Sequence, residues 1–438
     1  IIHYRQDTMT KKLLLLSVVA LGCQTTSLKA QDFNKYFTEN TLRINCIFGG
    51  NANEQHIFVD NMNSIPGWYG RKTRLGEFPV EGNAQFEMRD HKTGKVIYRN
   101  SLSTLFQEWQ TYDEARTSNK SFENVILMPM PKDSAEVTIK LKNNRRETVA
   151  SITETIAPKD VLISKKGSHP TPYDVIHKAA DTSNCINIAF LAEGYTETEM
   201  EKYINDVKIA TDAIFAHEPF LEYKDRFNVI AVKSVSEESG TSVPSKGIWK
   251  NTALGSNFDT FHSERYLTTL NLKKVHDWLA GTPYEHIIIL VNTDVYGGGG
   301  ILNYYNLSST GHKSFKPVIV HEFGHSFAGL ADEYAYDWEE IPMFPLDVEP
   351  WEANITTLAD FKGKWESLIE KGTPIPTPET KDEKKAKNKV GYFEGAGYRT
   401  KGVYRGVQDC RMRTNACKEF CIVCKNALTK LIKFYTGE

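Results

Sequence analysis

The sequence is poor in several features that define special classes of protein. It has seven cysteines among 438 residues, and a chain of this length buries a sizeable core without disulfide staples. Neither sign of charge is in excess, because 53 Lys and Arg residues face 55 Asp and Glu residues; the chain therefore offers no basic footprint for nucleic acid. With 29 Gly, 17 Pro and no long periodicity, collagen-like, disordered and coiled-coil classes are excluded. What remains is a globular protein, and its length favours two domains.

The N-terminal region, residues 1–30, has the pattern of upstream residues followed by a secretory signal peptide. Met9 is followed by two lysines and then by an apolar run over residues 13–22, which is too short to span a bilayer. Two cleavage sites compete. A lipoprotein box would anchor Cys23 by lipid, and an ordinary signal would end at Ala30. No later run of eighteen apolar residues occurs. We therefore expect a secreted, periplasmic or surface-anchored protein without a transmembrane span, in a compartment that permits disulfides.

Hydrophobic periodicity divides the rest of the chain. Over residues 31–157, apolar and polar residues alternate with period two between turn signals, which predicts an N-terminal all-β sandwich. Residues 158–184 have the composition of a linker. Over residues 185–438, apolar strands such as 286–291 alternate with helical stripes such as 200–214. This alternation predicts an α/β (α+β) domain.

The motif with the clearest chemistry is H-E-x-x-H, formed by His321, Glu322 and His325. On a helix, residues four apart share a face, so both imidazoles can bind one Zn²⁺. Glu322 would lie near a metal-bound water and can accept its proton as a general base. The alternative is a surface helix with two solvated histidines. The secretion signal and the acidic residues that follow favour zinc.

A zinc site of this kind needs a third protein ligand. Gly329 is suited to end the helix in left-handed geometry, so that a later residue can return to the metal. We favour Asp332 as this ligand, with Glu333 as the alternative. Glu339 and Glu340 are more remote options.

The C-terminal region concentrates four cysteines within fifteen residues: Cys410, Cys417, Cys421 and Cys424. Their spacing fits either two disulfides or one Cys₄ zinc site. We favour disulfides, because the spacing is unusual for a zinc ribbon and the expected compartment is oxidising. We expect Cys46 and Cys185 to be buried and unpaired.

The residues from His321 to Tyr334, together with three later segments, resemble peptidase family M64, the IgA-peptidase group of gut Bacteroides and clostridia. These segments are Phe393–Tyr398, Gly402–Arg405 and Cys410–Arg413. The resemblance implies an N-terminal β domain followed by a metzincin-like zinc-peptidase domain. It also implies that His321 and His325 are zinc ligands, that Glu322 is the catalytic base and that Met412 is the Met-turn residue.

The sequence departs from the general metzincin pattern at one point. Gly329 and Asp332 each lie one place later than that pattern puts them, which leaves the third ligand open.

Two further sets of residues are candidates for the substrate site. In metzincin-like domains an edge strand at this place pairs with the extended substrate, and four glycines there would allow a close approach. These are Gly297, Gly298, Gly299 and Gly300; the alternative is a flexible surface loop. Candidates to stabilise an oxyanion are Tyr334, Tyr398 and Tyr404, and ordinary packing is the alternative for each.

Together these features predict a secreted or surface-anchored, zinc-dependent endopeptidase that hydrolyses protein or peptide substrates through a metal-activated water. The family's name suggests host immunoglobulin as the substrate, although no residue encodes that choice. The alternative is a surface module that binds glycan or protein and carries a vestigial metal site. Neither hypothesis involves nucleic acid.

Overall fold

The computed structural model describes residues 33–336, 341, 343–382 and 389–438. The signal-like run, Cys23, Glu339 and Glu340 lie outside these residues. None of the helices in the described part of the chain has the length and hydropathy needed to span a bilayer.

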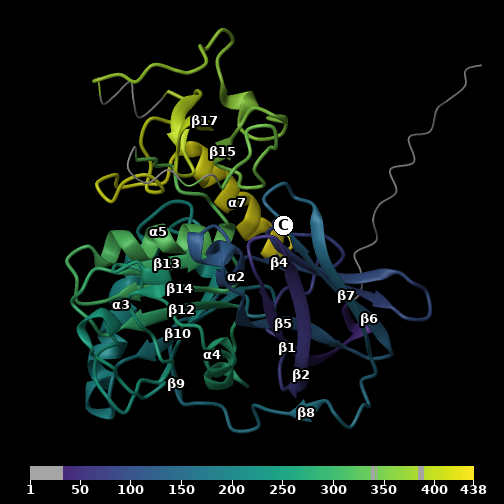
Figure 1. The fold of residues 1–438 in the computed structure, drawn as a ribbon. Helices are drawn as coiled ribbons and strands as arrows, with labels where there is room; N and C mark the ends of the chain where they lie inside the picture. Colours follow the sequence, from purple (N-terminus) through teal and green to yellow (C-terminus); the bar gives the residue numbers. More distant parts are fainter. Residues whose placement is uncertain (1–32, 337–340, 342, 383–388) are drawn as a thin grey trace, which may run out of the picture. The chain divides into compact units, whose positions relative to one another are not determined.

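The N-terminal part of the chain forms two four-stranded sheets with two short helices (Figure 1). The first sheet has the order β5-β1-β2-β8 and comprises β1 (Phe37–Gly50), β2 (Gln55–Ile65), β5 (Lys120–Pro131) and β8 (Ser164–Lys165). The second has the order β4-β3-β6-β7 and comprises β3 (Ala84–Asp90), β4 (Val96–Leu102), β6 (Ala135–Lys142) and β7 (Thr148–Ile156). The helices are α1 (Phe33–Tyr36) and α2 (Leu105–Trp109).

Strict alternation explains why these strands bury one face. In β6, Ala135, Val137, Ile139 and Leu141 are buried and the residues between them are partly exposed, as period two requires. Side chains from both sheets belong to one hydrophobic core.

A six-stranded mixed sheet forms the centre of the C-terminal part, in the order β13-β14-β12-β10-β11-β9. Its strands are β9 (Tyr173–His177), β10 (Ile186–Glu193), β11 (Phe227–Val232), β12 (His286–Val291), β13 (Gly298–Ile301) and β14 (Tyr305–Ser309). The four inner strands are parallel, and the two edge strands are antiparallel to their neighbours. Every residue of β10 and β12 is buried, which is typical of strands covered on both faces.

Helices cover one face of this sheet, and the N-terminal sheets help to cover the other. One core joins alternate residues of β10 to α3 (Met200–Phe215), α5 (Phe315–Ala328) and α7 (Ile422–Thr436). Ala189 and Leu191 of β10 join the core that holds α4 (Leu272–Leu279) and the two N-terminal sheets. Figure 1 shows α5 beside β13 and β14, at the edge of the sheet.

The remaining elements are small. A three-stranded sheet, in the order β15-β17-β16, comprises β15 (Ile355–Thr356), β16 (Phe393–Ala396) and β17 (Arg399–Arg405). Short 3₁₀ helices occupy Asp113–Arg116, Glu197–Glu199, Lys224–Arg226, Pro244–Lys246, Thr260–His262 and Glu366–Leu368.

The fold bears out the coarser part of the prediction, a sheet-rich mixed fold with several sheets and some helices. The sandwich and the metzincin-like architecture stay predictions. Residues 158–184, expected to be a linker, contribute two strands: β8 pairs with β2, and β9 pairs with β11. This segment is thus tied to both parts of the chain.

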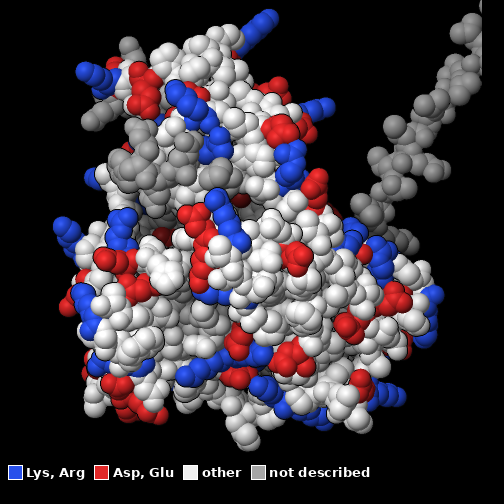
Figure 2. All heavy atoms as spheres, viewed as in Figure 1, with Lys and Arg blue, Asp and Glu red and all other residues white. Residues whose placement is uncertain are grey.

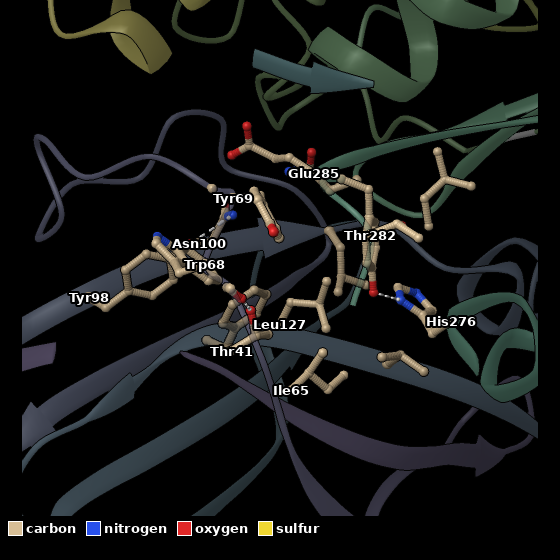
Figure 3. A pocket seen from close by; sticks show the side chains of 18 of the residues that line it. Thr41, Ile65, Trp68, Tyr69, Tyr98, Asn100, Leu127, His276, Thr282 and Glu285 are labelled. Carbon is tan, nitrogen blue, oxygen red and sulfur yellow. Dashed lines mark hydrogen bonds between the residues drawn. The ribbon is translucent and has the colours of Figure 1, made fainter. Parts of the chain in front are cut away.

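A pocket lies where the N-terminal sheets meet the C-terminal sheet, and Figure 3 shows it from close by. The amide of Asn187 on β10 donates to the Tyr69 carbonyl at 2.8 Å, and His276 Nδ1 lies 2.9 Å from the Tyr284 hydroxyl. Glu285 also lines this pocket. Burial raises the pKa of Glu285 to about 8. The H-E-x-x-H residues do not line this pocket.

Charged side chains are mixed on the face of the molecule that Figure 2 shows. Basic and acidic side chains lie among each other over this face, in keeping with a net charge of −2.

Candidate active site

Helix α5 carries both histidines of the motif on one face. His321 Nε2 and His325 Nε2 lie 3.0 Å apart, because four residues make about one turn. The helix packs against β13 and β14 and buries most of its residues. Its position, and with it the two imidazoles, is therefore fixed by the core.

Asp332 is the acidic residue that reaches the histidines. Its Oδ1 lies 3.0 Å from His321 Nε2 and 3.2 Å from His325 Nε2. Three potential ligand atoms thus converge, as metal ligands do. Glu333, the alternative third ligand, belongs to a different cluster of side chains.

The outer nitrogens of both imidazoles face backbone carbonyls. His321 Nδ1 lies 2.9 Å from the Arg411 carbonyl, and His325 Nδ1 contacts the Leu330 carbonyl. A carbonyl accepts a hydrogen bond, so these contacts favour the tautomer with a proton on Nδ1 and leave Nε2 as the metal-binding nitrogen. Metal-binding histidines usually donate their second ring N–H to a carbonyl or carboxylate in this way. Two inward nitrogens and one carboxylate oxygen form a donor set suited to zinc.

The charges of the three side chains are strongly linked. Burial lowers the pKa of His325, but the neighbouring Asp332 carboxylate has the larger net effect and raises this pKa to about 9. Burial also opposes ionisation of Asp332, yet the two histidines hold the pKa of this carboxyl far below its usual range. Without a metal, the Asp332 carboxylate therefore favours a second proton on His325, and a metal ion bound at Nε2 would displace that proton.

The chain turns back to the histidines immediately after α5 ends. Gly329 adopts left-handed geometry, with φ 61° and ψ 32°, and its N–H donates to the His325 carbonyl at 2.8 Å. A side chain there would collide with the Trp351 ring, 2.5 Å from an added Cβ. The buried Asn354 then holds Ala331 by two hydrogen bonds of 2.8 Å. Asp332 is the next residue, so these hydrogen bonds fix the backbone that carries it.

Glu322 lies on the side of α5 that faces β13. An added Cβ at Gly298 would lie 3.4 Å from Glu322 Oε1, so the carboxyl group is next to the edge strand. Burial raises the pKa of Glu322, while the two neighbouring histidines lower it. The carboxyl group is thus close to both the histidines and the strand.

Of the four consecutive glycines, Gly297 leads into this edge strand and the other three form part of it. An added Cβ at Gly300 would lie 2.1 Å from the Glu322 carbonyl oxygen, and one at Gly298 would lie 2.8 Å from Val318. At Gly297 it would meet Phe258 at 2.9 Å, whereas at Gly299 the nearest atom is 3.4 Å away. At three of these positions, neighbouring atoms, chiefly those of α5, lie too close to leave room for a side chain.

Two of the three candidate tyrosines lie at the site. The Tyr398 hydroxyl donates to Asp332 Oδ2 and lies 3.4 Å from the Tyr334 hydroxyl. The Tyr334 ring stacks near His321, with centroids 6.5 Å apart. Tyr404 lies on β17, where its charged neighbours are Glu394 and Lys401.

Met412, the residue that the family resemblance assigns to a Met-turn, packs against the helix of the motif at Gly324. It is fully buried, and its Sδ is 2.6 Å from the position of an added Cβ at Gly324. Its carbonyl accepts the Glu333 N–H at 2.8 Å. This bond links the turn at Met412 to the segment that carries Asp332.

The prediction of two disulfides in the C-terminal region is wrong. All six cysteines in the described residues are unbonded, and Cys410 Sγ and Cys424 Sγ lie 3.7 Å apart, against about 2.05 Å for a bond. Cys417 contacts the Glu419 carbonyl instead and does not belong to the cluster. Cys46 and Cys185 are buried and unpaired, as expected.

Sequence reasoning missed two residues near the site. In the sequence, Asn354 is a single polar residue between two apolar ones, and no motif marks it. Glu108 comes from α2 in the N-terminal part, and its carboxylate accepts the Tyr266 hydroxyl at 2.6 Å. Burial raises the pKa of Glu108 to about 7, and the charges of Asp332 and Glu322 add to this effect. No local pattern connects Glu108 with a motif more than two hundred residues away.

Comparisons with known proteins identify the family of the chain. The family model described as IgA Peptidase M64 matches residues 175–389 and 382–432, and the one described as Peptidase M64 N-terminus matches residues 32–153. No curated protein matches the chain. A crystal structure of metalloproteinase-II from Bacteroides fragilis aligns at 13% identity and a TM-score of 0.22, over 56% of this chain and 83% of that one. The chain belongs to peptidase family M64, and it is therefore a metallopeptidase with protein substrates.

Proposed function

We propose that the protein is a zinc-dependent endopeptidase. The convergence of His321 Nε2, His325 Nε2 and Asp332 Oδ1 within 3.2 Å supports this proposal most directly. These three side chains would hold the zinc, and a water molecule would complete the coordination. The backbone carbonyls behind both imidazoles support the proposal further, because they orient Nε2 toward the ion.

Bound zinc would supply a Lewis acid and lower the pKa of its water toward neutrality. Glu322 accepts the proton of the attacking water and passes it to the leaving amine. The edge strand β13, beside the Glu322 carboxyl group, aligns an extended substrate by main-chain hydrogen bonds. Tyr398 holds Asp332 in place through Oδ2, and the adjacent Tyr334 is a donor for the oxyanion.

We propose further that the enzyme acts outside the cytoplasm on host protein. The basic flank and apolar run at residues 13–22 support secretion, and Cys23 is suited to a lipid anchor. Immunoglobulin A is the first substrate to test, because the family model carries that name.

The variant Glu322→Gln tests this mechanism, since it removes the base and keeps the size of the side chain. We expect it to retain zinc and thermal stability while peptide hydrolysis falls by a factor of about 10²–10⁴. Glu201→Gln, at an exposed position on α3, is the matched control and should keep the wild-type rate. Wild-type turnover by the Glu322 variant would exclude this mechanism.

A further inference from the structure

A second group of potential metal ligands lies next to the active site. Glu333, Cys410, Cys421 and Cys424 each offer one ligand atom, and these four atoms lie within 4.8 Å of one another; we call this group the thiol cluster. It joins three segments of chain: the residue after Asp332, the turn before Met412 and the start of α7. It shares no residue with the histidine site.

The spacing of these atoms suits a tetrahedral ion. Two sulfurs that each bind zinc at about 2.3 Å lie about 3.8 Å apart in tetrahedral geometry, and Cys410 Sγ and Cys424 Sγ are 3.7 Å apart. Glu333 Oε1 lies 3.1 Å from Cys424 Sγ. Three cysteines and one carboxylate complete a set of four ligands without water, which is typical of a structural site.

The surroundings of Glu333 point to a missing ligand. Its side chain is fully buried, and Oε1 accepts the Asn354 amide at 2.9 Å. Its other oxygen, Oε2, is buried and has no hydrogen-bond partner. A buried carboxylate oxygen without a partner is costly in a protein interior, and a cation bound by this carboxylate would offset that cost.

Backbone N–H groups point at two of the three sulfurs, as donors to a metal-bound thiolate would. The Cys421 N–H donates to Cys410 Sγ at 3.2 Å, and the Cys424 N–H donates to Cys421 Sγ at 3.4 Å. Cys421 is also the N-cap of α7, a helix of 15 residues. The positive end of a helix stabilises a thiolate.

A disulfide would leave part of the thiol cluster without a partner. Three sulfurs can form only one bond among themselves, which leaves one thiol and the Glu333 carboxylate unpaired. The fourth nearby cysteine, Cys417, does not belong to the cluster. A tetrahedral zinc complex of three thiolates and one carboxylate carries a charge of −2, and the buried Arg405 and Arg411 contribute positive charge beside Glu333 and Cys410.

We propose that Glu333, Cys410, Cys421 and Cys424 bind a second, structural zinc ion. This ion fastens the segment after α5 to the turn at Met412 and to the start of α7. Because Glu333 follows Asp332 directly, the same ion fixes the backbone that presents Asp332 to the histidines. All four side chains bind the ion in their deprotonated forms, and every proton that they carry without the ion is released to solvent when it binds.

Metal content and the type of ligand test the proposal together. We expect two zinc ions per chain in the full protein purified with reductant and without chelator. The double variant His321→Ala/His325→Ala should retain one zinc, and X-ray absorption on it should show sulfur neighbours at about 2.3 Å. Cobalt added in place of zinc should give a thiolate charge-transfer band in this variant. None of these measurements depends on peptidase activity.

Glu333→Gln tests the carboxylate with little change in volume, and Cys417→Ser is the matched control. We expect Glu333→Gln to lose the sulfur-bound zinc to chelator at least tenfold faster than wild type, and Cys417→Ser to lose it at the wild-type rate. A double histidine variant that holds no metal, or holds it without sulfur neighbours, would overturn the proposal. So would an intact mass two hydrogens lighter under non-reducing conditions, because it shows a disulfide. An active protein that holds one zinc without sulfur neighbours would refute the second zinc site and leave the proposed catalytic site intact.

Discussion

Asp332 and Glu333 are consecutive in the chain, and their carboxylates face two different clusters. Asp332 Oδ1 lies 3.0 Å from His321 Nε2, whereas Glu333 Oε1 lies 3.1 Å from Cys424 Sγ. The Glu333 N–H donates to the Met412 carbonyl at 2.8 Å. One short extended segment therefore connects the active site, the thiol cluster and the turn at Met412.

Asp332→Asn should impair the histidine site. An amide keeps the size of the side chain but removes the negative charge that Asp332 contributes to the three-ligand site. We expect the variant to bind the active-site zinc at least tenfold more weakly and to lose activity in parallel, as measured by chelator titration. Asp212→Asn, at an exposed position on α3, should change neither. Wild-type zinc affinity in Asp332→Asn would contradict the assignment of the third ligand.

Tyr398→Phe removes the hydroxyl that donates to Asp332 Oδ2. Outer partners of metal ligands typically contribute a factor of about 10–100 to metal affinity or activity. We expect a loss in that range for Tyr398→Phe, measured as kcat/KM and zinc affinity. Tyr404→Phe is the comparison, because its charged neighbours lie on the small sheet. Equal effects of the two substitutions would refute the role given to Tyr398.

Gly300→Ala tests the close approach between β13 and α5. The new Cβ would lie 2.1 Å from the Glu322 carbonyl oxygen, so the strand or the helix must shift. Forced packing of this kind typically lowers the free energy of unfolding by about 1–3 kcal/mol, and here it should also reduce turnover. In Gly299→Ala the nearest atom is 3.4 Å away, and we expect nearly wild-type stability. Thermal melts and peptide hydrolysis of both variants provide the measurement.

The sequence predicted the local parts of this site well. H-E-x-x-H on a helix determines the relative position of two imidazoles, because helical geometry leaves little freedom over four residues. Gly329 marked the end of that helix, and its left-handed conformation follows from local sterics. Alternation of apolar residues likewise revealed β6 and the other strands with one exposed face.

Contacts between distant segments could not be predicted in this way. The choice between Asp332 and Glu333 depends on Asn354 and on the turn at Met412, about 20 and 80 residues further along the chain. The prediction of disulfides failed because it used only the spacing of the cysteines and the expected oxidising compartment. Spacing gave no sign that Glu333, and not Cys417, joins the other three cysteines. Glu108 approaches the site only because the N-terminal part packs beside the C-terminal sheet.

Glu285 should make stability depend on pH. Burial raises its pKa in the folded protein to about 8, from an ordinary value of 4.5. Between these values the folded protein keeps a proton that the unfolded chain has released, so stability falls as pH rises through this window. Glu285→Gln removes the titration and should be more stable than wild type at pH 8 by about 1–3 kcal/mol, with little difference near pH 4. Denaturant unfolding at both pH values gives the comparison, and equal differences at both would refute this assignment.

Removal and return of the metal test the central claim most directly. Peptide hydrolysis and zinc content would be measured on the same wild-type sample during chelation and then during stepwise addition of zinc. We predict that activity disappears with the sulfur-free zinc and returns when that site is refilled, while Glu322→Gln regains zinc and stays inactive. Undiminished hydrolysis by protein from which all zinc has been removed would contradict the account.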